Sequence, residues 1–406
     1  MLDATKIKKD FPIFQHRPDL VYLDSTATSL KPNSVIEALD RYYEEYSANI
    51  YRGVYGISEE ATEQYEKTRG IVAKFIHAKE EDVIFTRNTT ESINLVAYSL
   101  GRTIVNTGDE IVTSIAEHHS NFVPWQQLAF ENGAYFKVVD VDENGDMILD
   151  PIEKVITKKT KILALTHISN VLGVVNPIKT IISEAKKINP NIIIIIDGAQ
   201  AAPHISIDVS DLGCDFYAFS SHKILGPTGV GVLWGKQDLL EKIPPFNFGG
   251  EMIREVHLEK TIFKDPPHKF EAGTPPIGEV IALKEAIRYL EQIGLDKIHE
   301  HEQSLVSYAI KTLQEEFKSD IRIIVPNHSN KSGIIAFSFR HYHPHDVAQI
   351  LDENKICIRA GHHCAMPLHK RLSLQATARA SFYLYNTRED VDKVVNGLLK
   401  VKKILQ

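Results

Sequence analysis

A cysteine follows two histidines in a basic stretch near the end of the sequence. The stretch RAGHHCAMPLHKR covers residues 359–371 and places Cys364 after His362 and His363. Such a thiol could bind a metal, attack a substrate as a thiolate, or pack as a small apolar side chain. Consecutive residues do not readily converge on one tetrahedral ion, and no C-x-x-C or H-x-x-x-H pattern lies nearby, so zinc is disfavoured even though His369 could contribute a ligand. The glycine and the cations of the loop favour an accessible, nucleophilic thiol.

An aspartate and a lysine each end another apolar stretch. Asp197 closes an isoleucine-rich run and begins the motif DGAQ, and Lys223 follows a second apolar run within SSHK. Taken separately, Asp197 would cap a helix and Lys223 would be a solvated loop residue. Together they are the pair that pyridoxal phosphate (PLP) requires, because a lysine can form an imine and an acid can hold a protonated ring nitrogen.

Groups suited to phosphate and to an aromatic ring occur at two further positions. The stretch RNTTESIN follows a predicted strand and opens a predicted helix, where backbone N–H groups and the hydroxyls of Thr89 and Thr90 could bind phosphate. Ser220 and His222 could add donors, although structural hydrogen bonds are the ordinary role of such residues. His118, at a predicted strand-to-helix transition, either satisfies a structural hydrogen bond or stacks on an aromatic cofactor.

Short apolar runs rich in β-branched residues predict the strands that position these side chains. The runs cover residues 82–86, 110–113, 161–166, 191–197 and 215–220. Helical patterns at residues 90–100, 121–132 and 179–188 alternate with them, which predicts a mostly parallel sheet. Ligands bind at the carboxyl ends of the strands in such sheets, and the polar residues fall there.

The pattern changes in the C-terminal third of the chain. Longer helices are predicted over residues 279–293, 297–317 and about 388–405, with strands at 321–325 and 334–339. This predicts a second, smaller α+β domain. The expected division is a large cofactor-binding domain, 24–290, and a small domain, 1–23 and 291–406, that carries the cysteine loop at about 359–371.

Composition limits the classes of function. At 406 residues the chain exceeds the usual size of one hydrophobic core. A net charge of -7 does not provide the basic surface that nucleic-acid binding requires. Three cysteines are too few for a disulfide framework, and Cys214 and Cys357 are interpreted as inert thiols. Neither a targeting segment nor a bilayer-spanning stretch is recognised, so we expect a cytoplasmic protein without membrane or nucleic-acid partners.

Seven motifs, in order and spread over nearly the whole chain, resemble the Suf-type cysteine desulfurases. These are fold-type I PLP enzymes close to the selenocysteine lyases. The motifs are TTESIN, EHHSN followed by VPW, THISNVLG, DGAQ, SSHK followed by GPTGVG, FEAGTP and RAGHHCAMPL. The resemblance implies an α/β fold with a mostly parallel seven-stranded sheet between helices, PLP as the cofactor and L-cysteine as the substrate.

The resemblance also implies a role for individual residues in the cofactor site. Lys223 would hold PLP covalently, Asp197 would pair with the pyridine nitrogen, and Gln200 would bond the ring hydroxyl. His118 would stack on the ring and act as an acid and base. The residues expected at the phosphate are Thr89, Thr90, Ser220, His222 and, from a second subunit of a homodimer, Thr274.

Substrate and sulfur are assigned to other residues by the same resemblance. Arg379 would clamp the substrate carboxylate with its planar fork, and Asn170 would lie near that carboxylate and the ring. Arg359 would favour the thiolate or persulfide form of Cys364. Cys364 would take the sulfur of cysteine, leaving alanine and a persulfide that passes to a Suf acceptor of the E-type or U-type for iron–sulfur cluster assembly. No intrinsic metal is expected, but His343 is a candidate ligand for the zinc of a U-type partner.

Two departures from the family pattern and several alternative functions remain. Tyr51 stands where many relatives have a histidine, and Thr26 where alanine is commoner. A selenocysteine lyase would share the cofactor residues without depending on Cys364. An aminotransferase or a β-lyase would need no loop thiol, and a sulfur carrier or scaffold would need no cofactor. The roles of His362 and His363 stay open.

Overall fold

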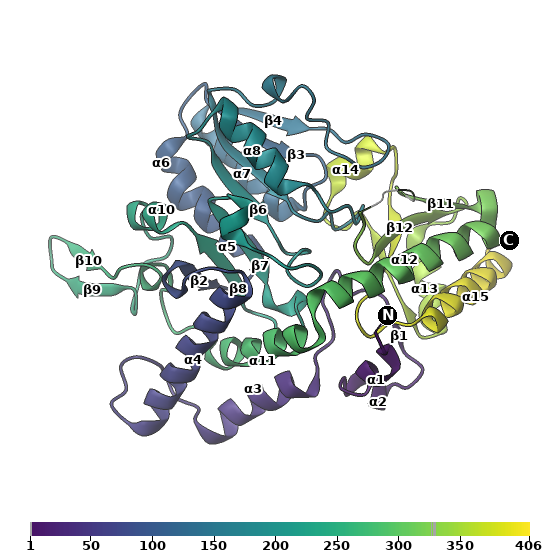
Figure 1. The fold of residues 1–406 in the computed structure, drawn as a ribbon, viewed down its shortest axis with the longest axis horizontal. Coiled ribbons are helices and arrows are strands. Elements are labelled where there is room, and N and C mark those ends of the chain that lie inside the picture. The colour runs from purple at the N-terminus through teal and green to yellow at the C-terminus, as the bar shows by residue number, and fades with distance from the viewer. Residues whose placement is uncertain (1, 326, 328–329) are drawn as a thin grey trace.

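A mostly parallel sheet forms the centre of the larger part of the molecule (Figure 1). The computed structural model describes residues 2–325, 327 and 330–406. Within these residues the seven strands are, in spatial order, β2 (Val83–Thr86), β8 (Gly231–Gly235), β7 (Phe216–Ser220), β6 (Ile193–Asp197), β5 (Thr160–Thr166), β3 (Glu110–Ser114) and β4 (Tyr135–Val139). Neighbours from β7 to β4 are parallel, whereas β8 is antiparallel to β2 and β7. The predicted fold class is confirmed.

Helices cover both faces of this sheet. One face packs against α3 (Asn33–Glu45), α4 (Gly56–Phe75), α8 (Ile178–Ile188), α9 (Val209–Leu212) and α11 (Ile277–Ile293), the other against α5 (Thr89–Val96), α7 (Val123–Asn132) and α10 (Gln237–Lys242). In β6, Ile194 and Ile196 belong to the first core and Ile195 to the second. Both sides of the strand are therefore apolar, which explains its unbroken run of isoleucines.

A second, antiparallel sheet lies at the right of Figure 1. Its strands are, in spatial order, β11 (Ile321–Ile323), β12 (Ile334–Phe339), β15 (Thr377–Ser381) and β14 (Arg359–Gly361). Three helices pack on it, α12 (Leu295–Phe317), α13 (Pro344–Glu353) and α15 (Arg388–Ile404). In β15, Ala378 and Ala380 pack in the core with these helices, so Thr377, Arg379 and Ser381 lie on the opposite face.

The N-terminal segment joins the second sheet region. Strand β1 (Val21–Tyr22) pairs in parallel with β13 (Ile356–Cys357), and Asp24 forms a bridge to Ser381 of β15. This pairing carries the residues after β1 to the face of β15 that lies opposite its helices. The division of the chain into domains at residues 24 and 290 remains a prediction.

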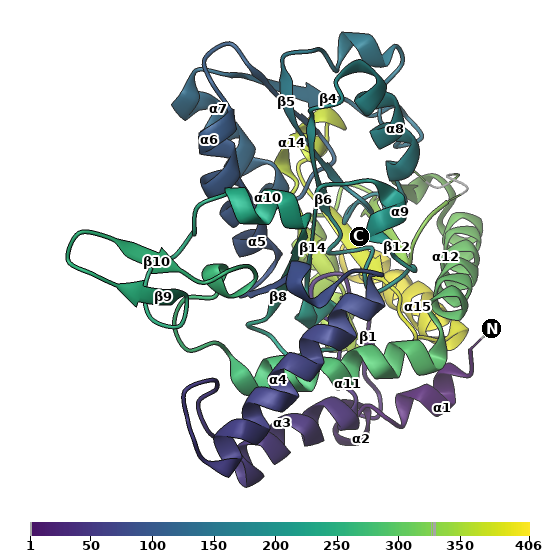
Figure 2. The same ribbon diagram turned by 60° about the vertical axis from the view of Figure 1, so that its left-hand side comes forward.

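A hairpin of β9 (Ile253–Val256) and β10 (Thr261–Phe263) projects from the body of the molecule (Figures 1 and 2). Leu258 near its tip is fully exposed. The remaining helices are α1 (Ala4–Lys8), α2 (Ile13–His16), α6 (Arg102–Ile104), α14 (Met366–Arg371) and a π-helical turn, Ala97–Gly101, that extends α5. Across the described ranges, we find no helix whose length and hydropathy would let it cross a bilayer.

Candidate active site

A cavity of about 220 Å³ lies where the carboxyl ends of the large sheet meet the second sheet. The predicted site residues that line it are Thr89, Thr90, His118, Asn170, Asp197, Gln200, Ser220, His222, Lys223, Arg359, Cys364 and Arg379. A neighbouring pocket of about 390 Å³ shares Thr90 and Ser120 but is lined mainly by residues of α5, α7 and the π-helical turn. Because that pocket contains neither the lysine nor the cysteine, the smaller cavity is the candidate active site.

Asp197 and Lys223 follow neighbouring parallel strands. Asp197 is the last residue of β6, and Lys223 ends the short turn after β7. Burial raises the pKa of Asp197, while the nearby Lys223 charge acts in the opposite direction. Burial lowers the pKa of Lys223 to about 8, and Asp197 partly offsets this shift. The pair therefore combines a deeply buried acid with an amine that loses its proton near neutral pH.

His118 is held as a neutral ring of defined tautomer. Its Nδ1 accepts a hydrogen bond from the backbone N–H of Ser120 at 3.1 Å. Burial, followed by the charge of Lys223, lowers the pKa of His118 to about 3. Because Nδ1 is an acceptor in a neutral ring, the proton lies on Nε2.

Hydroxyl groups gather at the start of α5. The Thr89 backbone N–H donates to Ser220 Oγ at 2.8 Å, and the two side-chain oxygens lie 2.6 Å apart. Thr90 Oγ1 lies 2.6 Å from Ser120 Oγ. His222 lines the same end of the cavity, and burial lowers its pKa to about 4. A helix start with several hydroxyls suits an anion such as phosphate.

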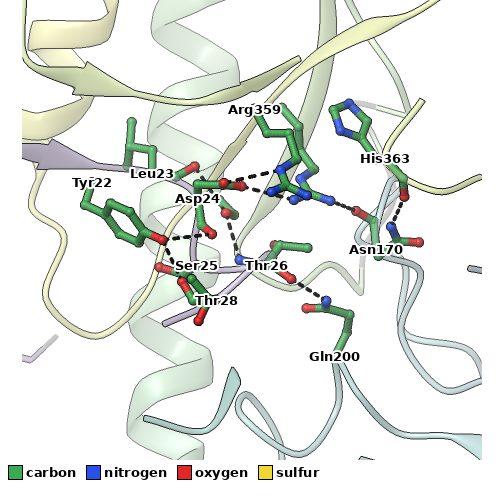
Figure 3. Close-up of polar contacts among 12 residues, drawn as sticks. Tyr22, Leu23, Asp24, Ser25, Thr26, Thr28, Asn170, Gln200, Arg359 and His363 are labelled. Atoms are coloured by element: carbon green, nitrogen blue, oxygen red, sulfur yellow. Dashed lines mark hydrogen bonds and ion pairs between the residues drawn. The ribbon is translucent and has the colours of Figure 1, made fainter. Parts of the chain in front are cut away.

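Asp24 lies between two arginines of the second sheet, and the sequence did not predict it as a site residue (Figure 3). Its Oδ1 lies 3.2 Å from an Arg379 terminal nitrogen, and its Oδ2 lies 3.3 Å from Arg359 Nε. Arg379 also donates to the Asn170 carbonyl at 3.0 Å. Burial lowers the pKa of Arg379 to about 10, and Asp24 opposes this shift. The only signal in the sequence was a carboxylate directly after a short apolar stretch.

Two buried amides in the cavity each leave their oxygen without a partner. Gln200 Nε2 donates to the Thr26 carbonyl at 2.8 Å, and Asn170 Nδ2 donates to the His363 carbonyl at 2.6 Å (Figure 3). Among the described residues, Gln200 Oε1, Asn170 Oδ1 and Arg379 Nε have no hydrogen-bond partner. Buried polar atoms are rarely left unpaired, so these atoms indicate where a ligand would bind.

Cys364 differs from the other two cysteines in exposure and backbone conformation. It is exposed, whereas Cys214 is buried with its pKa raised by burial to about 12, and Cys357 is half-buried. Cys364 and the preceding His363 both have positive φ, 56° and 51°. This left-handed conformation is unfavourable for non-glycine residues and persists only where other contacts hold it. His119 provides two such contacts, because its backbone N–H donates to the Cys364 carbonyl at 2.7 Å and its Nε2 accepts from the Met366 N–H at 3.1 Å.

Several residues singled out in the sequence lie outside the cavity, among them His362, His369, Thr274, His343 and Tyr51. Thr274 is exposed and lines a separate, open pocket that His222 also borders. His343 is exposed at the N-cap of α13. Tyr51 packs edge-on against Tyr65 and contacts Glu66. No group of three or more metal-ligating side chains was found within the described residues.

Comparisons with known proteins place this chain in a family. It matches the family model described as aminotransferase class-V over residues 21–394. A probable cysteine desulfurase from Halalkalibacterium halodurans is 50% identical and aligns over 99% of this chain and 98% of that protein. One from Streptomyces coelicolor is 48% identical, with the same coverage of 99% and 98%.

Two solved structures are similar over almost their full lengths. The apo cysteine desulfurase from Thermococcus onnurineus has a TM-score of 0.94 and 41% identity, covering 99% of this chain and 98% of that chain. The cysteine desulfurase CsdA from Escherichia coli has a TM-score of 0.92 and 36% identity, covering 100% and 99%. The chain belongs to the class-V aminotransferase family and has the fold-type I architecture of its cysteine desulfurases.

Proposed function

We propose that this protein is a PLP-dependent cysteine desulfurase that converts L-cysteine to L-alanine and retains the sulfur as a persulfide on Cys364. The observation that carries the proposal is one cavity lined by a half-buried lysine, a buried aspartate, a buried arginine and an exposed thiol. The full-length relatives named cysteine desulfurase support it. A selenocysteine lyase is not favoured, because such an enzyme would leave the exposed loop thiol without a role.

The described residues fit PLP. Asp197 is a buried carboxylate whose Oδ1 accepts from the Ala199 N–H at 2.9 Å, and it would pair with the pyridine nitrogen. The unpaired Gln200 Oε1 would accept from the ring hydroxyl. The phosphate would lie at Thr89, Thr90, Ser220 and His222. When bound, PLP supplies a sink for the electrons released at the substrate Cα.

Arg379 would bind and orient the substrate carboxylate. Its guanidinium is already aligned by Asp24 and the Asn170 carbonyl, while Nε has no partner among the described atoms. A planar guanidinium can offer two parallel N–H donors to a carboxylate. Asn170 Oδ1 is a nearby acceptor with no partner in the described chain.

Lys223 and His118 would handle protons. With a pKa of about 8, Lys223 is partly neutral at pH 7, so Nζ can accept the Cα proton. Ring stacking and the Nε2–H tautomer would suit His118 to orient the cofactor and to donate a hydrogen bond from Nε2.

Cys364 would receive the sulfur as a thiolate. Its Sγ forms an S–S bond to the substrate sulfur while the substrate Cβ–S bond breaks, and the electron pair of that bond remains on the substrate carbon. Protonation of the carbon gives alanine. The thiolate plus cysteine thus becomes a persulfide anion plus alanine, with no other oxidant or reductant. Cys364 lines the same cavity as Lys223 and Arg379, so two cationic side chains border the space that the thiol enters.

We assign the enzyme to the Suf-type subgroup, in which the persulfide passes to an E-type or U-type acceptor for iron–sulfur cluster assembly. The exposure of Cys364 gives an acceptor access, and His343 is the candidate contact for the zinc of a U-type partner. A homodimer would supply Thr274 to the phosphate of the other subunit. The exposed apolar residues Val256 and Leu258 on the projecting hairpin support such an association.

The test is incubation of the PLP-loaded protein with L-cysteine. We expect alanine and, by mass spectrometry, one additional sulfur on the peptide that contains Cys364. Accumulation of pyridoxamine phosphate with a keto acid would instead identify an aminotransferase. Absence of PLP absorbance and of borohydride trapping at Lys223 would identify a protein that keeps the fold without the cofactor.

A further inference from the structure

His363, whose role the sequence left open, is joined to β15 by a chain of side-chain hydrogen bonds. His363 Nε2 lies 2.9 Å from Thr377 Oγ1, and His369 Nε2 lies 3.0 Å from the same oxygen. At the other end of the chain, His369 Nδ1 lies 3.0 Å from the Ala365 carbonyl. All three side chains are buried, with exposed fractions of 5% for His363, 1% for His369 and 0% for Thr377.

The chemistry of the end groups fixes the direction of every hydrogen bond in this chain. The Ala365 carbonyl only accepts, so His369 carries its proton on Nδ1. A neutral His369 then accepts at Nε2, and the single hydroxyl proton of Thr377 must point to it. The Thr377 oxygen consequently accepts from His363, whose proton lies on Nε2. This leaves a lone pair on His363 Nδ1, an atom without a partner in the described structure.

The surroundings keep both rings neutral. Burial lowers the pKa of His363 to about 2, and the positive charges of Arg379 and Arg359 add to this effect. Burial also lowers the pKa of His369, although the hydrogen bond to the Ala365 carbonyl partly opposes this shift. The arginine charges therefore disfavour a second proton on His363, and burial disfavours one on His369.

This series of hydrogen bonds contacts the backbone on both sides of Cys364. His363 precedes the cysteine and Ala365 follows it, so Thr377 is linked to both sides of the residue through His363 and His369. The His363 carbonyl also accepts from Asn170 Nδ2 (Figure 3). These contacts oppose relaxation of the left-handed conformation of His363 and Cys364.

We propose that His363 is a positioning residue, held as the neutral Nε2–H tautomer by Thr377 and His369, and that this chain fixes the Cys364 backbone for attack on sulfur. His363 therefore neither accepts nor donates a proton during the reaction. The tautomers follow from the hydrogen bonds and from the neutrality of both rings, whereas the catalytic consequence rests on the proposed desulfurase function.

The tautomers are tested on the apo protein by NMR of ¹⁵N-labelled histidine, assigned with H363N and H369N variants. We expect a protonated Nε2 on His363 and a protonated Nδ1 on His369, with neither ring titrating between about pH 6 and about pH 8. A His363 that is charged in this range, or protonated on Nδ1, would overturn the proposal. Neither result depends on PLP or on turnover, so a failure here is distinct from a failure of the proposed function.

The positioning role is tested with Thr377→Val and Thr377→Ser in the PLP-loaded enzyme. Valine removes the hydroxyl, and we expect kcat for cysteine to fall about tenfold, KM to change little, and amide hydrogen exchange at residues 363–366 to accelerate. Serine keeps the hydroxyl and should restore both properties. Thr113→Val is the matched control, because Thr113 is a buried strand threonine whose hydroxyl donates to the Ala164 carbonyl away from the loop. Unchanged kcat and exchange in Thr377→Val, or failure of Thr377→Ser to restore them, would refute the role.

Discussion

The wall of the cavity formed by the large sheet and the wall formed by the second sheet hold their reactive groups in different ways. Asp197 ends β6, a strand buried on both faces, so the parallel hydrogen-bond ladder fixes its backbone. Lys223 closes the short turn directly after β7, the neighbouring strand of the same ladder. Cys364 lies on an exposed turn of left-handed conformation. Its backbone is held by side chains of other segments, including His119 and Asn170.

This difference matches two different chemical tasks. Charges that stabilise a bound cofactor work best in a rigid, dry environment, where they need not reorganise. A thiol that delivers sulfur to another protein must instead reach the surface, so its position depends on a few contacts rather than on a buried strand. Substitutions on the wall of the large sheet should consequently abolish all chemistry. Substitutions on the wall of the second sheet should impair sulfur transfer alone.

The largest expected loss of activity comes from a substitution on the wall formed by the large sheet. Lys223→Ala should lower alanine formation by about 10⁴-fold or more, because both the covalent anchor and the base at the Cα proton are lost. The measurement is alanine release under excess PLP. The control is Lys236→Ala, which removes a partly exposed lysine paired with Asp215 and should retain activity. A Lys223→Ala enzyme with substantial activity would show that the base lies elsewhere.

The next largest loss of activity is expected for Cys364, on the wall formed by the second sheet. Cys364→Ser should lower alanine formation from cysteine by at least about 100-fold, while PLP absorbance stays as in the unmodified protein. Turnover of selenocysteine should fall much less, since selenium can leave without thiolate attack. Cys357→Ser, at a half-buried cysteine, is the control. Equal losses for both substrates would mean that the thiol acts by some other route.

Arg379 joins the two walls, and its substitution should affect binding more than chemistry. Arg379→Lys keeps a charge but loses the planar fork, so KM for cysteine should rise about tenfold to 100-fold with a smaller fall in kcat. Steady-state kinetics measure both quantities. Arg371→Lys, at an exposed ion pair with Asp140, should leave them unchanged. A fall in kcat without a change in KM would contradict a role in carboxylate binding.

The pKa of Lys223 gives a prediction for cofactor capture by the apo protein. Burial lowers this pKa from 10.5 to about 8, and only the neutral amine reacts with PLP. The rate of capture should therefore rise about tenfold per pH unit below pH 8 and level off above it. Stopped-flow absorbance at several pH values measures the profile. A rise that continues without a break to pH 10 would indicate an unperturbed lysine.

The smallest expected effect concerns the outer side of the cysteine loop. Arg371 of α14 contacts Asp140 at 2.6 Å, with side chains 44% and 42% exposed. Because both groups are well solvated, Arg371→Ala should lower the free energy of unfolding by less than about 1 kcal/mol and leave turnover unchanged. Chemical denaturation measures the first quantity. A clear loss of turnover would show that the exposed ion pair between Arg371 and Asp140 also positions the cysteine loop, in addition to the buried contacts.

The two walls also differ in how far the sequence predicts them. A run of isoleucines marks β6 and the apolar run Phe216–Phe219 marks β7. Polar residues at the ends of such runs lie at the ligand edge, so Asp197 and Lys223 could be found. The antiparallel β8 was not predicted, because burial on both faces gives the same apolar pattern in either direction. The helix predicted to residue 100 instead changes to a π-helical turn after Val96.

Contacts between distant segments could not be read from local patterns. Asp24 reaches Arg379 only because β1 pairs with β13, which lies more than 300 residues later. Thr377 alternates with alanines in TARAS, a pattern that indicates one buried and one polar face but does not identify what that polar face contacts. Its two histidine partners follow from tertiary structure alone.

Asp24 makes substrate binding an exchange of anions. A carboxylate that approaches Arg379 meets a guanidinium already paired with Asp24, which Arg359 shares, so a simple carboxylate would gain less than it would at an unpaired arginine. Lys223 lines the same cavity as Arg379, so an amino acid would gain a second anchor through its amino group. The built-in competitor should thus discriminate amino acids from other small acids, even though both present the same carboxylate.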